Sequence, residues 1–151
     1  MSTTLDRPNA LALPRAILGA LDRIPYALLA IPLRLAVAEV FWASGTTKLA
    51  DWGAAVALFQ DEYKVPILPP DIAAVLAASI ELSTPILLVL GLFTRGAALV
   101  LLGMTGFIEI FVYPLAWPTH IQWAAMLLVL LARGAGTFSL DAVIRRRCLA
   151  L

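Results

Sequence analysis

Four ionisable residues lie inside stretches of sequence that are otherwise apolar, namely Arg34, Glu39, Glu81 and Glu109. On insertion scales an ionisable side chain at the centre of a membrane-spanning helix costs about 2.5–3.5 kcal/mol. Such side chains are therefore expected to face the interior of a bundle and to satisfy one another. A carboxylate in that setting can bind a proton, a cation or a polar headgroup, and an arginine can neutralise it.

The depth of each residue along its helix predicts which of them meet. With a rise of about 1.5 Å per residue, Glu39 and Glu109 lie at one level, and Arg34 and Glu81 lie near the middle of their spans. We therefore expect a structural ion pair between Arg34 and Glu81. Glu39 and Glu109 would then face each other without an internal cation, unless Lys48 or His120 reaches them.

Two further polar side chains extend this candidate site. Thr105 and Tyr113 are spaced four residues before and after Glu109, which places them on its helical face. The expected intramembrane pocket therefore contains Glu39, Glu109, His120, Tyr113 and Thr105. The sequence leaves open whether this pocket is a binding site or only an internal hydrogen-bond network, and Lys48 is expected to extend to the outer headgroups.

The composition places these residues in a membrane protein. The chain has 151 residues, of which 62% are hydrophobic and 14% charged, and its mean hydropathy is +0.92. Soluble domains carry roughly 25% charged residues, so this chain has too few charged residues to cover the surface of a soluble domain. A net charge of +1 gives no indication of a nucleic-acid partner. One cysteine excludes an intrachain disulfide, and one histidine with scattered carboxylates predicts no metal site.

Four windows are apolar and long enough to cross a bilayer, which needs about 17–25 residues per helix. They cover residues 26–49, 71–93, 96–116 and 117–132. We therefore predict an all-α integral membrane four-helix bundle over residues 26–133, with short amphipathic interfacial helices. One of these lies in an N-terminal segment, 1–25, and the other in an external loop, 50–70; residues 134–151 form a C-terminal tail.

The distribution of arginine and lysine predicts the orientation. Eight arginines, at 7, 15, 23, 95, 133 and 145–147, fall on the side of the termini, and only Lys48 and Lys64 fall on the other. Basic residues in short loops favour the cytoplasmic side. We expect a multi-pass protein of the bacterial cytoplasmic (inner) membrane with both termini in the cytoplasm.

Three segments together resemble the DoxX family of small four-span membrane proteins. They are RLAVAEVFWASGTTKL at 34–49, ELSTPILLVLGLFTR at 81–95, and GTFSLDAVIRRR at 136–147, where Ser139 is expected to cap a cytoplasmic helix. The family takes its name from a subunit linked to thiosulfate:quinone oxidoreduction. The resemblance therefore implies a redox-associated role with a quinone as ligand, and no covalently bound cofactor.

We accordingly predict an accessory or anchoring subunit of a quinone-linked membrane redox system, in contact with lipid and with a protein partner or further copies of itself. The chain has no haem-type histidine pair and no redox dithiol, so we expect it not to be catalytic alone, and the sequence leaves open whether it is an enzyme. Two alternatives remain open: a small proton, cation or solute transporter that uses the intramembrane carboxylates, and a purely structural subunit of a larger complex.

Overall fold

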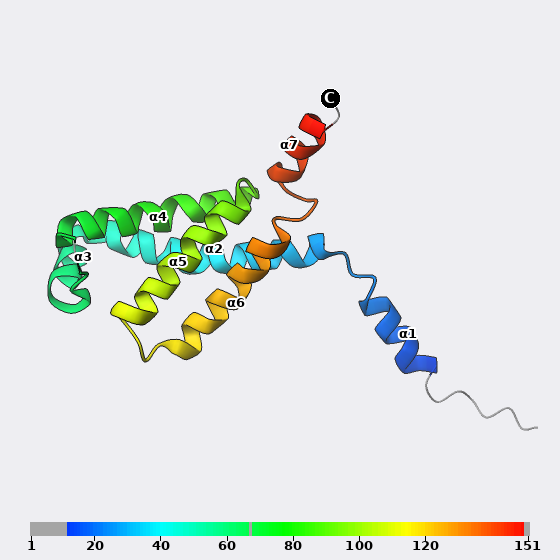
Figure 1. Ribbon diagram of the computed structural model, residues 1–151, viewed down its shortest axis with the longest axis horizontal. Helices are drawn as coiled ribbons and strands as arrows, with labels where there is room; N and C mark the ends of the chain where they lie inside the picture. Colours follow the sequence, from blue (N-terminus) through cyan, green and yellow to red (C-terminus); the bar gives the residue numbers. More distant parts are fainter. Residues whose placement is uncertain (1–11, 67, 150–151) are drawn as a thin grey trace, which may run out of the picture.

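The computed structural model describes residues 12–66 and 68–149, and the regular secondary structure of these residues is entirely helical. Helix α2 (Tyr26–Ala50) runs antiparallel to α4 (Pro70–Leu90) along most of its length. Helices α5 (Thr94–Phe111) and α6 (Trp117–Arg133) form a second antiparallel pair that packs against the first, as Figure 1 shows. The result is an all-α bundle of four main helices.

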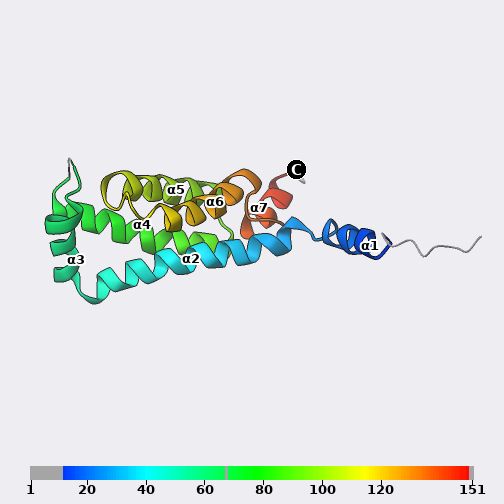
Figure 2. The same ribbon diagram turned by 90° about the horizontal axis from the view of Figure 1, so that it is seen from below.

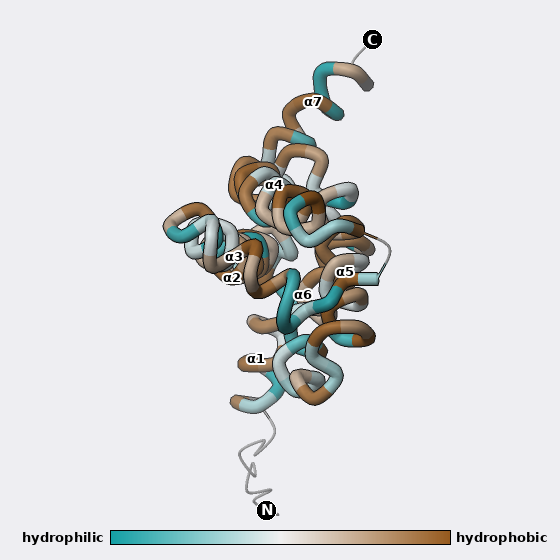
Figure 3. The backbone as a smooth tube through the Cα atoms, turned by 90° about the vertical axis from the view of Figure 1, so that its left-hand side faces the viewer, coloured by the Kyte–Doolittle hydropathy of each residue, from teal (hydrophilic) through white to brown (hydrophobic). Residues whose placement is uncertain are grey.

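The outer surface of the bundle is that of a membrane protein. Helices α2, α4 and α5 are long and apolar enough to cross a membrane, with mean hydropathies of 1.6, 2.0 and 1.4. Helix α6 is shorter, with 17 residues, or about 26 Å at the usual rise. Hydrophobic residues colour much of the bundle helices (Figure 3), and large apolar side chains on the outside are about half exposed, among them Leu35, Val75, Leu99 and Leu128.

Small residues let α2 and α4 approach closely. Ala30 and Ala38 of α2 and Ala74 and Ala78 of α4 are buried. At Gly45 an added Cβ would lie 2.9 Å from the side chain of Leu82, so only glycine fits without displacement. In a membrane the lipid tails are as apolar as the side chains, so the hydrophobic effect does not bring helices together. Helices there pack instead through close contact of their backbones at small residues. The remaining core is a central cluster that includes Val37, Phe41, Leu88, Leu101, Leu127 and Leu130.

Glycine and proline set two of the helix ends. Helix α4 ends at Leu90, where Gly91 follows with a φ of 63° and the N–H of Leu92 donates to the carbonyl of Leu87 over 2.9 Å. This end lies three residues before the expected limit of 93. Helix α5 ends at Phe111, five residues before the expected 116, because Pro114 disfavours helical geometry in the residue before it.

Different segments cover the two ends of the bundle. At one end α3 (Trp52–Leu58) and the π-helical turn η1 (Phe59–Tyr63) lie across α4, as seen in Figure 2, and Phe59 packs on Ala73 and Ala74. At the other end α1 (Ala12–Leu21) extends away from the bundle and α7 (Leu140–Leu149) begins near Gly91. Ser139 caps α7 as predicted, since its Oγ accepts from the N–H of Ala142 at 3.2 Å.

Candidate functional site

A cavity of about 480 Å³ lies inside the bundle at the end covered by α3 and η1. Side chains from all four main helices and from η1 line it, and most of them are apolar. Phe41, Met104, Phe107 and Trp123 form part of its wall. Its polar lining residues are few and come from separate elements: Ser44, Lys48, Tyr63, Glu81, Tyr113 and His120.

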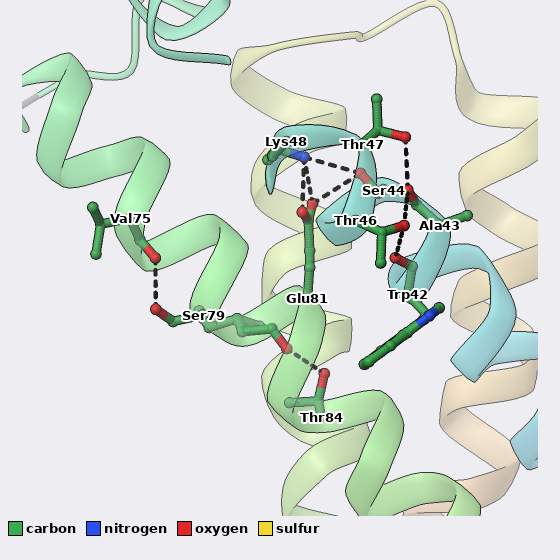
Figure 4. A network of polar contacts seen from close by, with 11 residues as sticks. Trp42, Ala43, Ser44, Thr46, Thr47, Lys48, Val75, Ser79, Glu81 and Thr84 are labelled. Atoms are coloured by element: carbon green, nitrogen blue, oxygen red, sulfur yellow. Dashed lines mark hydrogen bonds and ion pairs between the residues drawn. The ribbon is translucent and has the colours of Figure 1, made fainter. Parts of the chain in front are cut away.

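A buried ion pair joins α2 and α4 at this cavity. The Nζ of Lys48 lies 2.7 Å from Oε2 and 2.9 Å from Oε1 of Glu81, and the two side chains are 12% and 4% exposed. Ser44 donates to Oε1 of Glu81 at 3.1 Å and accepts from Nζ of Lys48 at 2.9 Å, as Figure 4 shows. Each charge is therefore balanced and hydrogen-bonded, which is the condition for retaining charges in an apolar interior.

Two sequence predictions about these charges are wrong. Lys48 turns inward to Glu81 instead of extending to the headgroups, and Glu81 does not pair with Arg34. Arg34 lies at the other end of the bundle, where its Nη2 donates to the carbonyl of Phe138 at 3.1 Å. Its Nη1 fills the space beside Gly91, where a Cβ would lie 2.1 Å away.

The physical reason is the register of the two helices. Arg34 is eight residues inside α2 and lies beside Gly91, which directly follows the last residue of α4. The start of α2 therefore extends about 12 Å beyond α4 at 1.5 Å per residue. The prediction assumed that the two helices begin and end at one level, and this overhang moves Arg34 out of reach of Glu81.

A second polar pair joins α5 and α6. The Nδ1 of His120 lies 2.5 Å from Oε2 of Glu109, with the His120 side chain 6% exposed and that of Glu109 18%. The ring of His120 also lies 5.1 Å from that of Trp123, measured between centroids. Within the described residues Nε2 of His120 makes no hydrogen bond. A carboxylate that holds one ring nitrogen fixes the tautomer and leaves the other nitrogen for a ligand.

Glu39 is absent from this site. It is exposed on the outer surface of α2, so the predicted facing pair of Glu39 and Glu109 is wrong. Val37 and Phe41 are buried in the core, and a residue two positions from each lies about 200° around a helix of 3.6 residues per turn. The depth of Glu39 in the membrane therefore did not predict its contacts, because the helical face on which a side chain lies decides which groups it can reach.

The two remaining predicted residues have separate roles. The hydroxyl of Thr105 is buried and donates to the carbonyl of Leu101 at 2.8 Å, within its own helix. Tyr113 lies beyond the end of α5, lines the cavity, and donates its hydroxyl hydrogen bond to Glu62 of η1. That hydrogen bond, with a contribution from burial, raises the pKa of Tyr113 above its ordinary value. Tyr113 thus ties the α5–α6 turn to the segment that covers the cavity.

The model of one protein family, DoxX, matches residues 29–114, which is more than half of the chain. The chain belongs to the DoxX family. The matched region of this DoxX chain runs from α2 to the turn after α5, so it contains Lys48, Glu81 and Glu109 but ends before His120. A search of curated proteins and a search of solved structures each found no match.

Sequence reasoning missed two contributors to the DoxX cavity, Ser44 and Tyr63. A signal was available for Ser44, because it lies four residues before Lys48 and therefore on the same helical face. Tyr63 carries no comparable signal, since its position depends on how η1 folds back over α4. Among the described residues no three histidine, cysteine, aspartate or glutamate side chains gather as metal ligands would.

Proposed function

We propose that this DoxX protein is a membrane-embedded binding subunit of a redox system and that its cavity accepts the headgroup of a quinone. The observation that carries the proposal is the apolar cavity of about 480 Å³ with the Lys48–Glu81 pair and His120 in its wall. Small-molecule sites typically have about 300–1,000 Å³, mostly apolar walls and a few placed polar groups. A quinone headgroup is a planar ring with two carbonyl oxygens and therefore needs both kinds of surface.

The wall of the cavity supports entry from the lipid. Leu76 of α4 and Val100 and Phe107 of α5 line the cavity and are also exposed on the outer surface, by 47%, 44% and 36%. The cavity therefore approaches the lipid-facing side between α4 and α5. A ligand dissolved in the membrane can reach it sideways, without passing through water.

The polar residues supply what a quinone or quinol would require of a protein. The ring of Trp123 and that of Phe41, 5.6 Å apart between centroids, provide aromatic surface for the headgroup. Nε2 of His120 can accept a proton from a hydroxyl group while Glu109 holds Nδ1. The ammonium of Lys48, whose hydrogen bonds go to Glu81 and Ser44, places a positive charge in the wall that attracts a carbonyl oxygen. The bound quinone would supply the two-electron chemistry. With one histidine and one cysteine in the chain, the electrons would pass to a redox group on a partner protein.

The geometry favours binding over transport. All polar groups of the cavity lie toward the α3 end of the bundle. Between them and Arg34 lies a layer of side chains that includes Leu88, Leu101, Leu127 and Leu130, each 0% exposed. A proton or cation relay needs polar groups or water along its whole length, and this layer interrupts such a path.

The outer face of α2 is the surface we assign to the protein partner. Leu28, Leu35, Glu39 and Trp42 are all exposed there, and seven-residue spacing places Leu28, Leu35 and Trp42 on one stripe. A carboxylate facing lipid alone is costly, and a partner helix that donates a hydrogen bond to Glu39 would remove that cost. This face is distinct from the cavity, so binding and assembly can be separated experimentally.

Titration of the purified protein in mild detergent with a short-chain ubiquinone tests the proposal. Quinones quench tryptophan fluorescence, and Trp123 in the cavity wall should report saturable binding. Glu109→Gln should weaken the affinity about tenfold, which corresponds to about 1.4 kcal/mol for one lost charge-assisted hydrogen bond.

Glu39→Gln is the matched control, because it removes the same charge from an apolar helix without touching the cavity. Its affinity should equal that of the unmodified protein. Quenching that does not saturate, or an equal loss of affinity in Glu39→Gln and Glu109→Gln, would refute the cavity as the quinone site.

A further inference from the structure

A second cavity, of about 570 Å³, lies at the opposite end of the bundle from the first. It is bounded by the start of α2, the start of α5, the end of α6 and the segment 134–137 that follows α6. Three arginines from three different elements line it: Arg95, Arg133 and Arg145. Residues far apart in the sequence thus bring three positive charges, all on exposed side chains, to one open cavity at this end of the bundle.

The positive charge of this cavity is not neutralised within the described part of the chain. No carboxylate of residues 12–66 or 68–149 lies within 4.0 Å of the guanidinium of Arg95, Arg133 or Arg145. Asp141 is the one acidic lining residue, and its two oxygens accept from the backbone N–H groups of Phe93 and Thr94 at 2.7 and 3.0 Å. Three guanidinium groups therefore face one carboxylate that already caps α5.

The contacts that hold this cavity in shape leave several hydrogen-bond donors without a partner among the described residues. The guanidinium of Arg133 lies 4.8 Å from the ring centroid of Tyr26, and the Tyr26 hydroxyl donates to the carbonyl of Gly134 at 2.8 Å. Arg95 donates through Nη2 to the carbonyl of Ala132 at 3.1 Å. The backbone N–H groups of residues 135–137 donate to no other described residue. Arginine forks and free backbone N–H groups are the donors that bind phosphate oxygens.

The position of the cavity decides between possible anions. It lies where the first residue of α2, the first turn of α5 and the last residue of α6 meet. Phe93, which also lines it, is 67% exposed, and its ring lies against the backbone at Gly96. Basic pockets between the ends of membrane helices are suited to anionic lipid headgroups. An apolar ring beside a cluster of arginines matches a ligand with a phosphate and an acyl chain.

We propose that this arginine cavity binds the phosphate of an anionic phospholipid, with Arg133 and Arg145 as its principal cationic contacts. The site is separate from the quinone cavity and does not depend on it. A zwitterionic lipid is a poorer ligand, because its ammonium group would add positive charge beside three arginines whose one acidic neighbour is already engaged.

The test is the thermal unfolding midpoint of the purified full-length protein in dodecyl maltoside micelles. Dioleoylphosphatidylglycerol, dioleoylphosphatidylcholine and inorganic phosphate are added separately. Phosphatidylglycerol should raise the midpoint more than phosphatidylcholine does. Arg133→Gln and Arg145→Gln should each weaken the apparent affinity about tenfold or more, as expected when one charge-assisted contact to phosphate is lost.

Arg147→Gln is the matched control, since Arg147 lies on α7 with Arg145 but does not line the cavity. Arg145→Gln keeps the test decisive if Arg133→Gln fails to fold, because Arg145 is exposed and has no hydrogen bond to other described residues. Equal effects of the two lipids, or equal losses in Arg145→Gln and Arg147→Gln, would overturn the proposal. A full shift with inorganic phosphate alone would also overturn it, in favour of a free-phosphate site.

Discussion

The ammonium of Lys48 and the carboxylate of Glu81 are almost enclosed by the bundle and contact each other and Ser44. Enclosing two charges has a large desolvation cost, which their attraction offsets only while both are present. The hydroxyl of Ser44 also bonds to both partners, so three side chains share one hydrogen-bond network. Removing a single charge therefore leaves the other one unpaired in an apolar interior.

We predict that Glu81→Gln lowers the free energy of unfolding by about 3–5 kcal/mol, the usual loss when one partner of a buried pair is removed. The double variant Lys48→Met, Glu81→Leu should regain most of that loss, because it removes both charges and keeps apolar volume. Unfolding with sodium dodecyl sulfate from dodecyl maltoside micelles measures both. Glu39→Gln should not lower the free energy of unfolding, because it removes a charge that faces lipid and has no buried partner; a loss there as large as in Glu81→Gln would contradict the assignment of the buried pair.

Individual charges show which kind of inference the sequence supports. The meeting of Glu109 and His120 was predictable, because a tight turn between two antiparallel helices brings nearby levels together. The pairing of Glu81 with Lys48 was not predictable, since it depends on how far α2 extends beyond α4. No local sequence pattern indicates that offset. Glu39 was misplaced because a charge in an apolar helix was assumed to face inward, whereas its neighbours Val37 and Phe41 already occupy that face.

At the scale of elements, Gly45 sets the distance between α2 and α4 where the Lys48–Glu81 pair forms. A Cβ at Gly45 would lie 2.9 Å from Leu82 and 3.1 Å from Cβ of Glu81. Gly106 of α5, in contrast, has no atom within 4 Å of such a Cβ. Gly106 is therefore the matched control for Gly45, because both glycines lie within helices and only Gly45 lies where two helices pack together.

Gly45→Ala should lower the free energy of unfolding by about 1–3 kcal/mol through overpacking, and it should also weaken ligand binding by moving Glu81. Gly106→Ala should leave the fold unchanged or stabilise it by up to about 1 kcal/mol, because alanine favours the helix more than glycine does. The same detergent unfolding experiment measures both variants. Equal effects of the two substitutions would show that α2 and α4 do not pack closely at Gly45.

The main helices were predictable within a few residues, because long apolar runs and prolines mark their limits. Proline positions explain the end of α5, and the capping of α7 by Ser139 also followed from the sequence. The cavity was not predictable. It depends on η1 packing over Ala73 and Ala74 and on the tie between Tyr113 and Glu62, and both contacts are between segments distant in the chain.

At the scale of the whole molecule, the arrangement of charge predicts how the protein lies in the membrane. Both α1 and α7 lie at the arginine-rich end, which also contains Arg95 and Arg133. The opposite end contains the acidic residues Asp51, Asp61 and Glu62. Positively charged loops remain in the cytoplasm during insertion, so the end with the termini should be cytoplasmic.

The single cysteine, Cys148, allows this orientation to be measured by thiol labelling without introducing another cysteine. Cys148 is exposed on α7, so a membrane-impermeant maleimide should modify it in inside-out membrane vesicles and not in intact spheroplasts. The double variant Cys148→Ser, Asp61→Cys should show the reverse, because Asp61 is exposed at the other end of the bundle. Labelling of Cys148 in spheroplasts would reverse the orientation. It would also place the arginine cavity in the outer leaflet and the quinone cavity near the cytoplasmic one, so one measurement fixes the leaflet of each proposed ligand.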